Sequence, residues 1–152
     1  MKKIFLIIFL LSLNISFWFL GYNIAKKKFY NPPKPIIISL KQINEQKLFD
    51  LIQKYRYENY LPTYSKSDFL CNIADKRLQQ IKTDFSHIIF STSHYCDNCV
   101  ISENLAKDFH DEQVLFTAWL NSPTHAQILK VPYTYSCLKT DGNNTVQIFG
   151  YY

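Results

Sequence analysis

The feature that most constrains the fold of this chain is an apolar run near its N-terminus. Residues 4–20 read IFLIIFLLSLNISFWFL, interrupted only by Ser12, Asn14 and Ser16. The run is apolar on all sides and has no amphipathic face to pack against a core. Extended to Ala25 it has 22 residues, and at about 1.5 Å per residue such a helix crosses a hydrocarbon core of about 30 Å. The sequence therefore predicts an N-terminal transmembrane helix, with any globular domain built from the residues C-terminal to it.

Residues 1–30 are interpreted as a membrane anchor or, alternatively, as a cleaved signal segment. Lys2 and Lys3 precede the apolar run and residues 26–28 are lysines, so basic flanks do not settle its orientation. A cleaved signal ends in a small-x-small site, but Asn23 lies three residues before the best exit, after Ala25. We expect a single-pass anchor in the cell membrane with an extracytoplasmic domain, or a secreted domain if the segment is cleaved.

Residues 31–40 are predicted to be a Pro-rich spacer, and residues 41–152 a single domain. Three prolines within residues 32–35 prevent a helix, because proline lacks a backbone donor and its ring clashes with the preceding turn. The net charge of +5 comes from the N-terminal lysines, since from Lys41 onward there are 11 Lys and Arg against 12 Asp and Glu. A nearly neutral domain has no general excess of positive charge to bind phosphates, so we expect no nucleic-acid partner.

Hydrophobic periodicity predicts three helices in the domain. The first has apolar residues at three- to four-residue spacing and ends near Asn59, because the residue before Pro62 disfavours helical geometry. Ser67 is the expected N-cap of the second helix, whose apolar stripe ends at Ile81. The third spans residues 112–120, and its expected inward residues are Val114, Leu115, Ala118 and Trp119.

The remaining segments predict loops, a helical turn and a hairpin. Residues 84–102 look loop-rich, and Pro123 suits the first position of a short helical turn. Residues 133–140 and 145–151 are expected to form two strands joined by the turn DGNN at residues 141–144. Helices packed on a small antiparallel sheet make the predicted class α+β.

Several motifs, in order, resemble those of the CAP (SCP-like) superfamily, bacterial type. Residues 85–87 (FSH) are similar to the family's F-S-H, and residues 102–106 (SENLA) to its G-E-N-[IL]-A. Residues 119–129 (WLNSPTHAQIL) resemble W-x-x-S-P-G-H-R-x-N-I-L, and residues 146–150 (VQIFG) its last strand. The resemblance covers residues 41–152 and implies an α-β-α sandwich around a small antiparallel sheet.

The resemblance also implies a cleft with two histidines and acidic residues, which in several family members binds a divalent metal. Carried over, these residues are His87, His125 and Glu103. Imidazoles and a carboxylate suit an ion such as zinc, or a polar ligand held by hydrogen bonds. The second acidic residue of animal and plant members is Ser122 here, which leaves a minimal ligand set. A purely structural Glu103, accepting backbone N–H groups in a loop, is the alternative.

Four cysteines behind an export segment predict disulfide bonds. Three connectivities are open among Cys71, Cys96, Cys99 and Cys137. A zinc ion bound by His94, Cys96 and Cys99 is the alternative for the Cys-x-x-Cys segment, but a structural zinc site takes four protein ligands. We favour disulfides.

Fold does not decide function, so three functions remain. The preferred one is a binding module that holds a small ligand, lipid-like molecule or peptide, with a divalent metal as the only cofactor considered. The alternative is a peptidase-like hydrolase in which Glu103 orients His87 or His125 as a general base, although no recognisable nucleophile accompanies them. An envelope structural or adhesion protein is the third.

Overall fold

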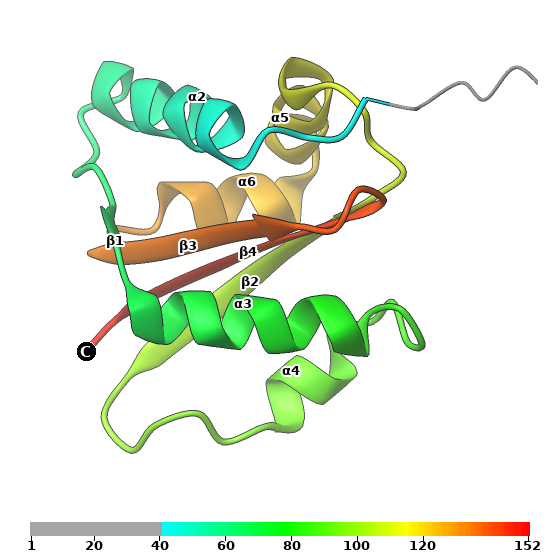
Figure 1. The fold of residues 1–152 in the computed structure, drawn as a ribbon. Coiled ribbons are helices and arrows are strands. Elements are labelled where there is room, and N and C mark those ends of the chain that lie inside the picture. Colours follow the sequence, from blue (N-terminus) through cyan, green and yellow to red (C-terminus); the bar gives the residue numbers. More distant parts are fainter. Residues whose placement is uncertain (1–40) are drawn as a thin grey trace, which may run out of the picture. The chain divides into compact units, whose positions relative to one another are not determined.

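The structure, a computed structural model, describes residues 41–152, in which a four-stranded sheet lies between two helical layers (Figure 1). One layer contains α2 (Glu45–Glu58), α5 (Glu112–Asn121) and α6 (Pro123–Lys130). The other contains α3 (Asp68–Gln80) and the short α4 (Ile88–Thr92). This arrangement is the predicted α-β-α sandwich. The predicted anchor and spacer lie outside the described residues.

The sheet has the strand order β1-β3-β4-β2 and is mixed, which corrects the prediction of a purely antiparallel sheet. β2 (Val100–Lys107), β4 (Asn144–Tyr151) and β3 (Tyr135–Thr140) pair antiparallel. The two-residue β1 (Ser65–Lys66) pairs parallel with the start of β3. So short a strand has no sequence pattern of its own. The hairpin of β3 and β4 is confirmed, and Gly142 in its turn has φ +98°, a conformation that suits a residue without Cβ.

Local capping explains where the long helices begin. The side chain of Asn44 accepts a hydrogen bond from the backbone of Lys47 at the start of α2. Ser67, the predicted cap, accepts from the backbone of Leu70 at the start of α3. Each cap satisfies an N–H group that has no partner within its helix. α2 ends at Glu58, next to the predicted end near Asn59, and α3 ends at Gln80, next to Ile81, the last residue of the predicted apolar stripe.

Two predictions about local structure are only partly right. The segment 84–102, predicted to be loop-rich, contains α4 and the first residues of β2. Glu103 and Asn104 are central residues of that strand, although their polarity on successive positions looks like a loop. In α5, Val114 is 59% exposed and does not face inward, whereas Phe116 is buried. Leu115 and Trp119 are buried as predicted, so only part of the predicted inward side of α5 is wrong.

Each face of the sheet covers its own core cluster. Leu138 and Phe149 lie on the face toward α2, α5 and α6, together with Trp119. Leu105, Val146 and Ile148 lie on the face toward α3. Alternate residues of a strand point to opposite faces of the sheet. Because helices cover both faces, nearly every residue of β4 is buried. Trp119 donates from Nε1 to the Leu105 carbonyl at 3.1 Å, which confirms it as a core residue.

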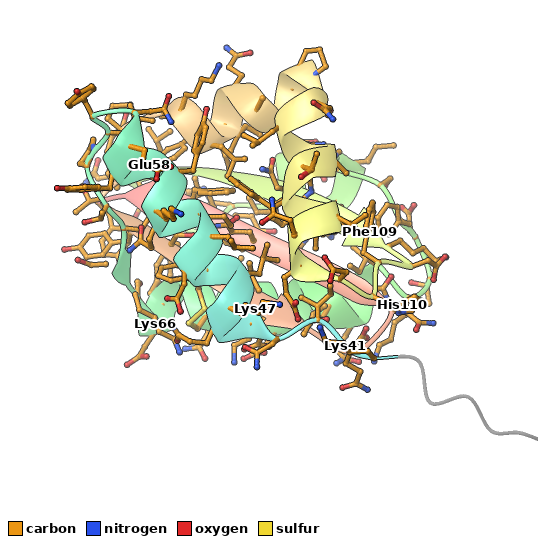
Figure 2. All side chains as sticks on the ribbon, turned by 90° about the horizontal axis from the view of Figure 1, so that it is seen from above. Lys41, Lys47, Glu58, Lys66, Phe109 and His110 are labelled. Atoms are coloured by element: carbon orange, nitrogen blue, oxygen red, sulfur yellow. A yellow bond between two sulfur atoms is a disulfide. The ribbon has the colours of Figure 1, made fainter. Side chains whose placement is uncertain are left out.

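A buried carboxylate fastens the start of the domain to α5. Glu112, fully buried at the beginning of that helix, accepts from the Nζ of Lys47 at 2.8 Å and of Lys41 at 3.3 Å, and from the backbone N–H of Asn44 at 2.9 Å. Figure 2 looks down on α2 and α5 and labels both lysines. The hydrogen bond from Lys47 lowers the pKa of Glu112 to about 2, so this carboxylate is ionised at neutral pH.

None of the helices described between residues 41 and 152 has the length and apolar character needed to cross a bilayer.

Candidate functional site

The central contact of the candidate site joins His87 and Glu103. The Nδ1 atom of His87, the residue just before α4, lies 2.9 Å from Oε1 of Glu103, which projects from β2. The Glu103 side chain is 2% exposed, whereas that of His87 is 55% exposed. A carboxylate that accepts from Nδ1–H holds a neutral imidazole in the tautomer whose Nε2 is an acceptor. Glu103 can therefore orient a histidine whose ring meets solvent.

Arg77 of α3 holds the same carboxylate from the other side. Its Nε donates to Glu103 Oε2 at 2.8 Å and its Nη2 to Oε1 at 2.9 Å. Nη2 also donates to the Ser86 carbonyl at 2.9 Å, next to His87 in the chain. Both partners of this forked pair are almost fully buried. Arg77 thus fixes the Glu103 carboxylate and the backbone that carries His87.

Residues 103 and 104 of β2, an edge strand, connect the two layers of the molecule. Glu103 faces the α3 side and binds His87, while its neighbour Asn104 points to the opposite face. Asn104 Nδ2 donates to the backbone carbonyl of His125 in α6 at 3.3 Å. The ring centroids of His87 and His125 lie 6.5 Å apart. Two adjacent residues of one strand therefore bring together histidines from opposite sides of the sheet.

The surroundings of the His125 ring favour its uncharged form. Its ring is half-buried and its centroid lies 6.5 Å from that of Trp119. Burial lowers the pKa of His125 below its usual 6.5, and the nearby His87 lowers it further. A lowered folded-state pKa keeps the imidazole neutral at pH 7 and able to accept a hydrogen bond.

The three predicted site residues lie together, but their contacts do not form a closed metal site. Both oxygens of Glu103 already accept from Arg77, and Oε1 also contacts His87. Within the described residues, no cluster of three or more His, Cys, Asp or Glu side chains could hold a metal ion. Two imidazoles therefore remain, fewer than the three or four protein ligands of a zinc centre. The described residues therefore do not complete a metal site by themselves.

The cysteines pair as two disulfides, Cys71–Cys137 and Cys96–Cys99. The first joins α3 to β3 in the core, and the second closes the loop before β2. The prediction of disulfides is confirmed, and the alternative zinc site at the Cys-x-x-Cys segment is wrong because both of its thiolate ligands are used. His94 instead lies 3.0 Å from the exposed Asp97.

Arg77 is the member of the site that sequence reasoning missed. It lies inside the apolar stripe of the second helix, where arginine commonly extends to solvent. The available signal was its spacing. Arg77 follows Ile73 by four residues and Ala74 by three, so it lies on the helix face that the stripe buries. A buried arginine needs an acidic partner, and Glu103 was the acidic residue already expected inside the domain.

Comparison of the sequence with protein-family models gives no match, and comparison with curated proteins gives none either. Solved structures do match the fold. An outer surface protein from Borrelia burgdorferi is 23% identical with a TM-score of 0.62, and the match covers 72% of this chain and 96% of that one.

Two further structures carry the family name. A cysteine-rich secretory protein from Staphylococcus aureus is 18% identical (TM-score 0.57), and an extracellular SCP-domain protein from Bacillus anthracis is 20% identical (TM-score 0.57). The matches cover 69% and 79% of this chain, but only 37% and 44% of those longer proteins. The described domain therefore shares the fold of these SCP-domain proteins, the fold that the motif resemblance implied. The similar proteins are outer-surface or extracellular by description.

Proposed function

We propose that this protein is an extracytoplasmic binding module that holds a small polar ligand between His87 and His125. The observation that carries the proposal is the convergence of the two rings, with His87 oriented by Glu103. A neutral imidazole offers one donor and one acceptor, so the pair can bind a hydroxyl, carboxylate or amide group of a small molecule, lipid headgroup or peptide. The buried Arg77–Glu103 pair makes the arrangement rigid, which lowers the entropy lost on binding.

Zinc binding tests whether the imidazoles of His87 and His125 can contact the same bound species. We expect calorimetry on residues 36–152 at pH 7.5 to give one weak zinc site, and His125→Ala to weaken it at least about tenfold, or 1.4 kcal/mol. Affinity should fall as the pH is lowered below 6.5, because the pKa of His125 lies below its usual value and protons then compete with zinc for its imidazole. His94→Ala, which removes an exposed histidine elsewhere, is the matched control. Zinc binding that His94→Ala abolishes and His125→Ala leaves intact would contradict the proposed site.

A peptidase-like hydrolase is the second candidate, and the His87–Glu103 contact favours it. A base held by a carboxylate is the arrangement of general base catalysis. Neither nearby serine is hydrogen-bonded to a histidine base as an activated nucleophile would be: Ser86 Oγ accepts from the Ile88 backbone and Ser122 Oγ contacts Thr124. The attacking group would be a water molecule deprotonated by His87. Hydrolysis of a peptide library by the wild-type protein but not by His87→Ala would favour this candidate over the binding module.

We also propose that residues 4–25 anchor the domain to the cell membrane. The length of the apolar run and the poor exit site at Asn23 support this location. The protein is expected to stay in the membrane fraction through high-salt and carbonate washes, which release electrostatic contacts but not an inserted helix. A mature N-terminus at Lys26 would instead identify a cleaved signal peptide and a secreted domain.

A further inference from the structure

The two disulfides of the domain differ in burial and in the loops they close. Cys71 and Cys137 are 8% and 1% exposed, and their bond spans a sequence separation of 66. Cys96 and Cys99 are half-buried, their separation is 3, and Asp97 and Asn98 between them are exposed. A short loop gains little stability from its cross-link, and a half-buried sulfur is within reach of an attacking thiolate. The Cys96–Cys99 bond therefore contributes little to the stability of the domain and is accessible to an attacking thiolate.

The surroundings of Cys96–Cys99 also allow the bond to open without loss of the core. Its loop follows α4 and precedes β2, and it contacts the domain through Tyr95, whose ring lies 5.1 Å from that of the buried Phe90. Neither of the two residues between Cys96 and Cys99 belongs to a core cluster of the described domain. Reduction of this bond would free two exposed residues, whereas reduction of Cys71–Cys137 would remove a covalent link between α3 and β3 inside a core cluster.

Both cysteines line a hollow with aromatic walls. The hollow has a volume of about 460 Å³ and is lined by Cys96, Asp97, Asn98, Cys99, Phe69 and Tyr152. Phe69 meets the Tyr152 ring edge-on at 5.4 Å, and the other neighbour, Tyr135, stacks on Tyr152 at 5.0 Å. Phe69 and Tyr152 remain 37% and 56% exposed. A volume of this size holds a few residues of a peptide, and the rings offer apolar contact beside the sulfur atoms.

We infer that Cys96–Cys99 is a thiol–disulfide exchange centre whose substrate is a cysteine-bearing peptide or protein segment docked in this hollow. A substrate thiolate attacks one sulfur of the pair, the Cys96–Cys99 bond breaks, and a mixed disulfide and a cysteine thiolate form. A second substrate thiolate attacks the mixed disulfide and leaves with an intramolecular disulfide. The substrate is oxidised by two electrons, and Cys96 and Cys99 become a dithiol after taking up the two protons that the substrate lost. The site is separate from the His87–His125 pair and does not depend on its function.

The first test compares the two disulfides in the full chain in detergent. Limiting dithiothreitol at pH 7.5, timed alkylation and peptide mapping by mass spectrometry measure the opening of each bond. Cys96–Cys99 is expected to open at least about 100-fold faster than Cys71–Cys137, since exchange requires that the attacking thiolate reach a sulfur atom. Equal rates, or faster opening of Cys71–Cys137, would overturn the exchange centre.

The second test examines the hollow with a synthetic reduced peptide that carries two cysteines flanked by leucines. Oxidation of this peptide by the full chain should slow at least about fivefold in Phe69→Ala, because an apolar contact of about 1 kcal/mol is lost, while the reaction with dithiothreitol keeps its rate. Tyr60→Ala, which alters a 99% exposed tyrosine that does not line the hollow, is the control. A Phe69→Ala variant that oxidises the peptide as fast as the wild type would overturn the docking role of the hollow.

Discussion

Replacing Arg77 with alanine is expected to lower the free energy of unfolding by about 3–5 kcal/mol, the usual cost of leaving one partner of a buried ion pair without the other. Glu103 would keep only the contact from His87, and the Ser86 carbonyl would lose its donor. Urea unfolding at pH 7 with both disulfides intact measures the change.

Two further variants test whether the effect of Arg77→Ala comes from the buried ion pair. Lys54→Ala, which breaks an exposed pair with Glu58 at 3.8 Å, should cost less than about 0.5 kcal/mol. Adding Glu103→Gln to Arg77→Ala should be less destabilising than the sum of the single changes, because it removes the unpaired charge. Additive effects, or a loss below about 1 kcal/mol for Arg77→Ala, would contradict a structural role for this ion pair.

Removing the Cys71–Cys137 disulfide by replacing both residues with alanine is expected to cost about 4 kcal/mol. The chain-entropy relation gives roughly this value for a cross-link over a separation of 66 residues. The same relation gives only about 2 kcal/mol for a loop as short as Cys96–Cys99. The buried bond also fastens α3 to β3, so its loss leaves a defect in the core around Leu70 and Ile148.

The matched control for this prediction is the Cys96→Ala/Cys99→Ala variant, which removes a disulfide of the same chemistry from an exposed loop. Thermal and urea unfolding of both double variants, each at neutral pH, compares the two bonds. A larger loss of stability for the Cys96/Cys99 variant would show that the loop, and not the α3–β3 link, stabilises the domain.

The sequence alone predicted the features that depend on neighbours in the chain. The cap Ser67 and the proline Pro62 act within about one helical turn, so the start of α3 and the end of α2 could be located closely. The resemblance of the F-S-H, S-E-N and S-P-x-H segments to CAP motifs implied His87, Glu103 and His125 as site residues. The structure brings these three residues together, as the resemblance implied.

The tertiary structure alone decided which distant residues meet. Glu103 and Asn104 look like loop residues because both are polar, yet both are buried. On opposite faces of β2, Glu103 accepts from Arg77 and the Asn104 Nδ2 donates to the His125 carbonyl. β1 is too short to show a hydrophobic pattern in the sequence, and it forms only because its backbone pairs with β3. The pairing of Cys71 with Cys137 likewise depends on α3 packing against β3. Burial makes unpaired charges and hydrogen-bonding groups costly, and only the complete fold determines which groups are buried and which partners can reach them.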